Sequence, residues 1–175
     1  GADRNSVIVN LGGGVVTDLG GFVASTFKRG IDFINVPTSL LAMVDASIGG
    51  KTGINLGASK NQIGTITQPK AVFTSTAFLE TLSKEEFDSG KGEMLKHLLI
   101  SDKDALSKLS IIEGDISEDG IASSIQVKLN LVAADVNEKG ERKALNYGHT
   151  FGHAIESFLI ENQSPIAHGK AVFLD

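Results

Sequence analysis

The sequence contains no cysteine among its 175 residues. The absence of thiols excludes a disulfide framework, a thiolate nucleophile and any cysteine-ligated metal site, and it is typical of a reducing compartment. A metal site in this chain would therefore need histidine and carboxylate ligands. A basic excess is also lacking, since 16 Lys and Arg residues stand against 21 Asp and Glu residues for a net charge of −5. Nucleic acid is consequently not an expected partner.

Long apolar runs are absent as well. No run approaches the roughly 18 residues that span a bilayer, and the first five residues do not form a basic-then-apolar leader. We therefore expect a soluble, cytoplasmic protein with no membrane partner. Apolar residues make up 41% and charged residues 21% of the chain, which is typical of a folded globular protein. The chain starts without Met and enters a predicted strand almost at once, so we expect a fragment of a longer protein.

Glycine is abundant, with 20 residues, and many of them precede residue 65. The apolar run 7–11, ended by three glycines, predicts a buried parallel strand. A helix is predicted at 18–28 and a second strand at 33–36, and this order is typical of a parallel α/β sheet. Segments 45–53 and 57–61 are predicted to be loops, the first of them functional, and a further strand is expected at 71–74.

The character of the chain changes near residue 80. Ser83, followed three residues later by Glu86, matches a capping box that opens a helix. Segments 106–109, 121–136 and 147–160 also have helical patterns. In the longest of them one face is predicted to be core, on the spacing of Ile121, Ile125, Leu129, Val132 and Val136. We therefore predict an α/β part over residues 1–80 and an all-helical part over residues 81–175.

The triple glycine at 12–14 lies between a predicted strand and a predicted helix that contains Asp18. Glycines at such a turn let a pyrophosphate approach the backbone N–H groups at the helix N-terminus. The pattern is not G-x-G-x-x-G, so a plain tight turn explains it about equally well. Lys51 follows two glycines, which is a common arrangement for holding phosphate.

Three of the four histidines fall within twenty residues. His149 and His153 are four apart on a predicted helix and share a face, and His168 follows a Pro-containing turn. With a carboxylate they could bind a catalytic Zn²⁺, whereas the spacing alone is explained more simply by two helix-surface histidines. Glu93 and Lys96 are three apart on a predicted helix, and on that segment alone a surface ion pair is the simpler interpretation.

Three long motifs carry a family resemblance: GGGVVTD at 12–18, PTSLLAMVDASIGGKTG at 37–53 and NYGHTFGHAIE at 146–156, with Lys60 and Asn61 between the last two. They closely resemble the 3-dehydroquinate synthase family, and the match runs through nearly the whole chain. The resemblance implies a parallel Rossmann-like nucleotide-binding portion followed by a helical metal-binding domain. Residues 1–80 would be the C-terminal part of the NAD-binding domain, and residues 81–175 the first part of the metal and substrate domain.

The resemblance also implies an activity. Members of the family convert 3-deoxy-D-arabino-heptulosonate 7-phosphate to 3-dehydroquinate and phosphate in the shikimate pathway, with catalytic NAD and a divalent metal, zinc or cobalt. The implied assembly is a homodimer. Three alternatives stay open: a related sugar-phosphate cyclase of the inosose or valiolone type, an NAD- and metal-dependent polyol dehydrogenase, and an inactive fragment. Family members extend well beyond both ends of this sequence, so the isolated chain is expected to be inactive.

Site residues follow from the same resemblance. The implied metal ligands are Glu93, His149 and His168, and His153 resembles a substrate contact near the leaving phosphate. The implied cofactor contacts are Gly13, Gly14, Asp18, Thr38, Ser39, Asp45, Lys60, Thr81 and Glu86. The implied pocket for the polyanionic substrate consists of Lys51, Asn61, Lys96, Lys128, Arg142 and Asn146. Arg29 resembles an arginine that reaches the phosphate from the neighbouring subunit.

Overall fold

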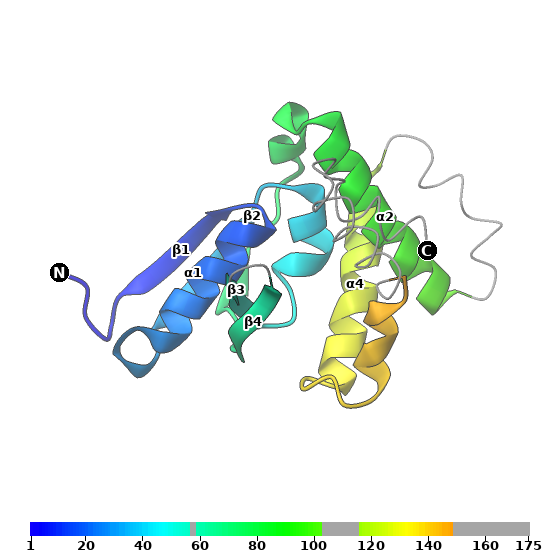
Figure 1. Cartoon of the computed structure of the whole chain (residues 1–175). Helices are drawn as coiled ribbons and strands as arrows, with labels where there is room; N and C mark the ends of the chain where they lie inside the picture. Colours follow the sequence, from blue (N-terminus) through cyan, green and yellow to red (C-terminus); the bar gives the residue numbers. More distant parts are fainter. Residues whose placement is uncertain (57–58, 103–115, 149–175) are drawn as a thin grey trace. The chain divides into compact units, whose positions relative to one another are not determined.

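The computed structural model describes residues 1–56, 59–102 and 116–148 (Figure 1). The chain divides into two compact units, Gly1–Glu80 and Thr81–Asp175. The first is an α/β unit, and the described residues of the second are helical or without regular structure. The predicted order of a parallel α/β portion followed by a helical part is confirmed. Within the described ranges, no helix combines the length and apolar character needed to cross a membrane.

The first unit is built on a small parallel sheet. Strand β1 (Val7–Gly12) pairs in parallel with β2 (Asp32–Pro37), and β2 pairs in parallel with β5 (Ala71–Val72). Helix α1 (Gly14–Thr26) connects β1 to β2 and packs on both strands, so the predicted strand–helix–strand unit is confirmed. The short helix η1 (Phe27–Arg29) follows α1 and ends at Gly30. Ala24, Ile31 and Phe33 form the core between helix and sheet.

Strand β1 is less buried than the sequence predicts. The side chains of Val7, Val9 and Leu11 are 51%, 60% and 59% exposed, whereas Asn10 is buried. Because β1 is an edge strand of the described sheet and successive side chains point to opposite faces, only the face toward α1 is covered.

Residues 45–66 differ from the predicted pair of loops. The helical turn η2 (Ala42–Ala46) is followed by β3 (Lys51–Leu56), which pairs antiparallel with β4 (Ser59–Ile66). The loop predictions are therefore wrong for 51–53 and 59–61. Among the described residues these two strands form a separate two-stranded sheet, and a hydroxyl pair, Thr52 Oγ1 to Thr65 Oγ1 at 2.8 Å, lies between them.

The second unit contains three described helices. The short helix η3 (Thr76–Thr81) precedes it, and α2 (Lys84–Ser101), α4 (Glu118–Ala134) and η5 (Glu141–Asn146) follow. Helices α2 and α4 lie side by side, and η5 packs on both (Figure 1). The predicted helix at 106–109 lies outside the described residues, as do residues 149–160 of the last one.

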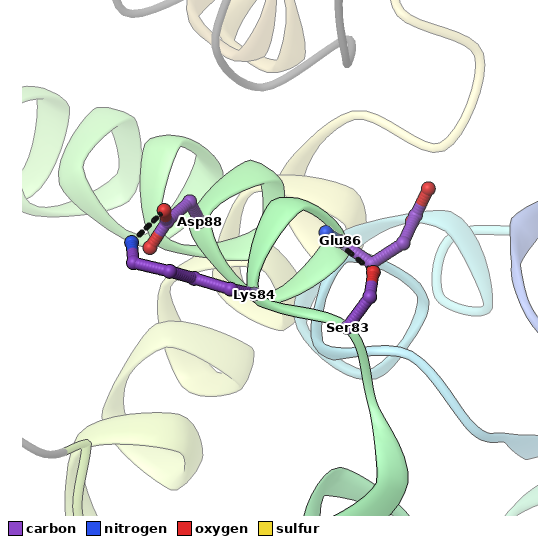
Figure 2. A network of polar contacts seen from close by, with 4 residues as sticks. All are labelled: Ser83, Lys84, Glu86 and Asp88. Atoms are coloured by element: carbon purple, nitrogen blue, oxygen red, sulfur yellow. Dashed lines mark hydrogen bonds and ion pairs between the residues drawn. The ribbon is translucent and has the colours of Figure 1, made fainter.

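The start of α2 confirms the predicted capping residue. Ser83 Oγ accepts a hydrogen bond from the Glu86 backbone N–H at 3.3 Å, and Lys84 forms an ion pair with Asp88 one turn along (Figure 2). Such a cap satisfies one of the N–H groups that a helix N-terminus leaves without an internal partner. Ser117 caps α4 in the same way, by accepting from the Gly120 N–H at 3.1 Å.

The buried face of α4 is partly polar. The buried residues are Ile121, Ser124, Lys128 and Val132. The predicted core face is wrong for Leu129 and Val136, which are each 43% exposed. The apolar pattern of α4 does not predict its buried face correctly, because two of the four buried residues, Ser124 and Lys128, are polar or charged.

Candidate functional site

The carboxyl ends of β1 and β2 bring the predicted cofactor glycines beside Thr38 and Ser39. The Thr38 N–H donates to the Gly12 carbonyl at 3.0 Å. A Cβ on Gly13 would lie 3.3 Å from Ser39 Oγ, so this position forms a tight cradle. Gly13 is also the N-cap of α1 and offers no side-chain hydrogen bond to the helix. Open α/β sheets bind ligands at this edge, and a helix N-terminus suits a phosphate group.

A cavity of about 360 Å³ lies in the same unit. Asp18 of α1 lines it together with Lys51 of β3 and Asn61 of β4, so three predicted site residues meet there. The backbone of Asn61 has a φ of +52°, and its N–H donates to Asn55 Oδ1 at 3.0 Å. Such a cavity, lined by a carboxylate, an ammonium and an amide, suits a polar small molecule.

A buried ionic cluster lies in the second unit. Glu93 and Lys96 form an ion pair on α2, and their side chains are 0% and 3% exposed. Lys128 on α4 is 6% exposed and Arg142 on η5 is 1% exposed. The simpler interpretation of Glu93 and Lys96 as a surface pair is therefore wrong. Burying a charge is costly unless it is paired, and the described buried residues here supply three cations for one carboxylate.

Asp135 organises the loop that carries Arg142. Its Oδ1 accepts from the Lys139 N–H at 3.0 Å, and its Oδ2 accepts from the N–H groups of Gly140 at 2.6 Å and Arg142 at 3.3 Å. These bonds, above all the one from Gly140, lower the pKa of the Asp135 carboxyl below its usual value. Arg142 Nη1 in turn donates to the Val136 carbonyl at 2.7 Å. Asp135 was not predicted from the sequence. An Asp followed closely by the turn-forming residues Asn137 and Gly140 would have indicated a residue that organises a turn.

His97 is a second buried residue that the sequence analysis did not select. It is 1% exposed, and its Nδ1 lies 2.7 Å from Ser124 Oγ on α4. One of its ring nitrogens and a carboxylate oxygen of Glu93 lie within 4.8 Å of each other. The available signal was the spacing of four between Glu93 and His97, which places both side chains on one face of α2.

The remaining predicted residues lie elsewhere. Asn146 is exposed and donates from Nδ2 to Glu138 Oε1 at 2.8 Å. Arg29 is exposed and has a φ of +70°. Thr81 and Glu86 are exposed, and Asp45 is half-buried on η2. Lys60 belongs to β4, although its side chain is outside the described part. The predicted ligands His149 and His168 and the predicted substrate contact His153 lie outside the described residues.

Known proteins resemble this chain along nearly its whole length. A curated 3-dehydroquinate synthase from Parabacteroides distasonis is 48% identical over 177 residues, covering 98% of this chain and 50% of that protein. The structure of a 2-epi-5-epi-valiolone synthase from Streptomyces hygroscopicus subsp. jinggangensis, with NAD⁺ and Zn²⁺ bound, superimposes with a TM-score of 0.85 at 29% identity, covering 98% of this chain and 49% of that one. A 2-deoxy-scyllo-inosose synthase complexed with carbaglucose-6-phosphate, NAD⁺ and Co²⁺ gives 0.83 at 31% identity, covering 98% and 48%.

The chain thus spans about half the length of the relatives it matches. The family model for the N-terminal part of 3-dehydroquinate synthase matches residues 1–89, and the model for the C-terminal part matches residues 90–175. The chain belongs to the 3-dehydroquinate synthase family.

Proposed function

We propose that the protein carrying this chain is a 3-dehydroquinate synthase, which converts 3-deoxy-D-arabino-heptulosonate 7-phosphate to 3-dehydroquinate and phosphate. The observation that carries the proposal is the burial of three cations, Lys96, Lys128 and Arg142, on three helices of the second unit that pack on one another, with Glu93 paired to Lys96. A substrate with a carboxylate and a phosphate is an anion for which such a cluster is suited, because desolvated anions need charged hydrogen bonds. Family membership and 48% identity to a curated synthase support the same activity.

The first unit fits a dinucleotide. Gly13 has no side chain, and a Cβ there would lie close to Ser39. The glycine therefore leaves room for a pyrophosphate to approach the N-terminus of α1. We assign the cofactor contacts to Gly13, Gly14, Asp18, Thr38, Ser39, Asp45 and Lys60, with Thr81 and Glu86 as additional members. When bound, NAD supplies a hydride acceptor that is regenerated within the cycle. The first unit's task is to orient it.

Glu93 fits a metal ligand. Its carboxylate is fully buried, and a second donor type suited to zinc, the His97 imidazole, lies near it. We assign the ligand set to Glu93, His149 and His168. When bound, a divalent cation supplies Lewis-acid polarisation of a substrate hydroxyl. Metal analysis of the wild type and of His149→Ala tests this set, and equal metal content in the two would remove His149 from it.

The chain's cations bind and orient the substrate in this proposal. Arg142 pairs with the carboxylate, because its planar fork matches that group. Lys96 and Lys128 neutralise further oxygens in a region from which water is excluded, where each ionic contact is strengthened. The remaining assigned contacts, some of them exposed or outside the described residues, are Lys51, Asn61, Asn146, His153 and Arg29.

The test uses the protein encoded by the full reading frame. We expect it to release phosphate from 3-deoxy-D-arabino-heptulosonate 7-phosphate with catalytic NAD and no net NADH. Stoichiometric NADH formation would instead indicate a dehydrogenase. Faster turnover of a sugar phosphate that lacks the carboxylate would indicate a cyclase like the two structural relatives. The observation that favours this second candidate function is the high TM-score of both relatives.

A further inference from the structure

His97 joins α2 to α4, two of the three helices that carry the ionic cluster. Its Nδ1 lies 2.7 Å from Ser124 Oγ, and both side chains are buried, at 1% and 5% exposure. A serine hydroxyl can accept from a ring N–H or donate to a ring nitrogen, so the bond holds for either neutral tautomer. A buried side-chain pair linking two helices restrains their relative position more than an apolar contact does, because its geometry is directional.

The hydrogen bond between His97 and Ser124 lies close to the buried charged residues of both helices. On α2, His97 directly follows Lys96 and lies one helical turn beyond Glu93. On α4, Ser124 lies one turn before Lys128, on the same buried face. The hydrogen bond therefore joins α2 and α4 within one turn of three of the charged groups in the cluster.

Two further observations link His97 to Glu93. A ring nitrogen of His97 and a carboxylate oxygen of Glu93 lie within 4.8 Å of each other. Both side chains are essentially inaccessible to solvent. Residues that hold a metal-binding carboxylate in place commonly affect metal affinity without touching the metal.

We propose that His97 is a positioning residue: through its Nδ1 bond to Ser124 it holds the α2 turn carrying Glu93 and Lys96 against the α4 turn carrying Lys128. This inference rests on the proposed function, because it assigns His97 a part in the affinity of Glu93 for a divalent cation. It predicts that the Nδ1 side of the ring is the essential one.

The variants separate the two ring nitrogens. In His97→Asn the side-chain amide takes the place of Nδ1, whereas in His97→Gln it reaches toward the place of Nε2. Ser124→Ala removes the partner and leaves the histidine. Ser123→Ala is the matched control, since Ser123 is the exposed neighbour on the same helix. Each variant is made in the full reading frame, stripped of metal and titrated with Co²⁺ by its absorption spectrum, while kcat and KM are measured by phosphate release.

We expect Ser124→Ala and His97→Gln each to weaken Co²⁺ binding about 10–100-fold, as losses of such supporting residues do. His97→Asn should stay within about threefold of the wild type, and Ser123→Ala should bind like the wild type. The double variant His97→Gln with Ser124→Ala should be no weaker than either single one, because both remove the same bond.

Two outcomes would overturn the inference while the wild type stays active. The first is wild-type Co²⁺ affinity in Ser124→Ala together with loss in His97→Asn, which would mean that the ring acts through Nε2. The second is a lowered melting temperature in Ser124→Ala and His97→Gln while both bind Co²⁺ as tightly as the wild type. That result would mean that His97 has a packing role only. A wild-type protein that neither binds Co²⁺ nor releases phosphate would instead overturn the proposed function, and this inference with it.

Discussion

At the scale of single residues, Arg142 is 1% exposed, and its guanidinium is held by a hydrogen bond that Nη1 donates to the Val136 carbonyl. The three buried cations come from three separate elements, α2, α4 and η5, so their burial is not a local effect of sequence spacing. Burying such charges is costly, and under the proposed function the anionic substrate offsets part of that cost when it binds.

We predict that Arg142→Ala lowers kcat/KM for phosphate release more than a hundredfold. The reason is that a substrate carboxylate inside a closed site would lose a charged bidentate partner, which is typically worth about 3 kcal/mol or more. Lys143→Ala, which removes the exposed cation next to it, is the control and should change kcat/KM by no more than about twofold. A decline of less than about tenfold in Arg142→Ala would be too small for a lost carboxylate contact.

Asp135 is predicted to make the 135–142 loop acid-sensitive. The lowered pKa of its carboxyl means that the folded state favours the ionised form, so this contribution to stability is present above the usual Asp pKa of 3.8. It is lost as the pH falls through the lower, folded-state value. Asp135→Asn keeps one acceptor oxygen and loses the charge, so it should lower the melting temperature at pH 7 and flatten the decrease of the melting temperature below about pH 4.

The melting temperature as a function of pH measures this effect. Glu141→Gln, which changes an exposed carboxylate in the same loop, is the control. Parallel pH profiles for the wild type and Asp135→Asn would show that the charge of Asp135 does not contribute. Because Asp135 also positions the backbone of Arg142, we expect KM for the substrate to rise in Asp135→Asn as well.

At the scale of elements, α1 approaches β1 closely at Gly20. A Cβ on Gly20 would lie 1.8 Å from Asn10 Oδ1. Asn10 cannot move freely, because it is buried and its Nδ2 donates to Asn35 Oδ1 on β2 at 2.9 Å. Asn35 Nδ2 donates in turn to the Ser47 carbonyl at 3.1 Å. This chain of amides links the helix contact to the segment that follows η2.

We predict that Gly20→Ala destabilises the protein by about 1–3 kcal/mol, the usual cost of overpacking, although alanine is the better helix former. Urea denaturation measures the change. The matched control is Gly120→Ala in the first turn of α4, where the nearest atom to an added Cβ is 3.5 Å away. That substitution should be neutral or stabilising by up to about 1 kcal/mol. Equal stability of Gly20→Ala and the wild type would show that α1 can move away from β1 at no cost.

At the scale of the whole molecule, we propose a homodimer in which Arg29 reaches a phosphate in the partner subunit's pocket, as the family resemblance implies. Three successive residues, Lys28, Arg29 and Gly30, have φ values of +48°, +70° and +110°. A non-glycine residue in this region is strained, and such strain is often kept where a side chain has a task. Arg29 is exposed on this turn, which agrees with the proposal that it reaches a phosphate in the partner subunit.

We predict that mixing Arg29→Ala with Lys96→Ala restores activity that neither variant has alone. If the pocket takes Arg29 from one subunit and Lys96 from the other, random mixing of homodimers returns about a quarter of the wild-type activity. Phosphate release after co-expression measures it. Lys96→Ala mixed with Arg142→Ala is the control, because both residues belong to the same unit and every pocket would stay defective. An absence of recovery in demonstrated mixed dimers would contradict the shared pocket.

Several features of this protein are determined by the sequence alone. The absence of cysteine left imidazole and carboxylate as metal ligands, and the strand–glycine–helix order predicted the parallel β1–α1–β2 unit that the structure contains. Ser83 predicted the start of α2, because a helix cap is a local interaction between residues three apart. The long motifs indicated the family, which the match of both family models bears out.

Tertiary structure decided the rest, because burial and charge pairing depend on residues far apart in sequence. Spacing alone made Glu93 and Lys96 a surface pair, whereas the packing of α2, α4 and η5 buries them with Lys128 and Arg142. The apolar pattern of α4 pointed to Leu129, yet the helix turns Ser124 inward, because His97 is its partner. Periodicity records which side chains share a face, but only the neighbouring elements determine whether that face meets water, an apolar core or another charge.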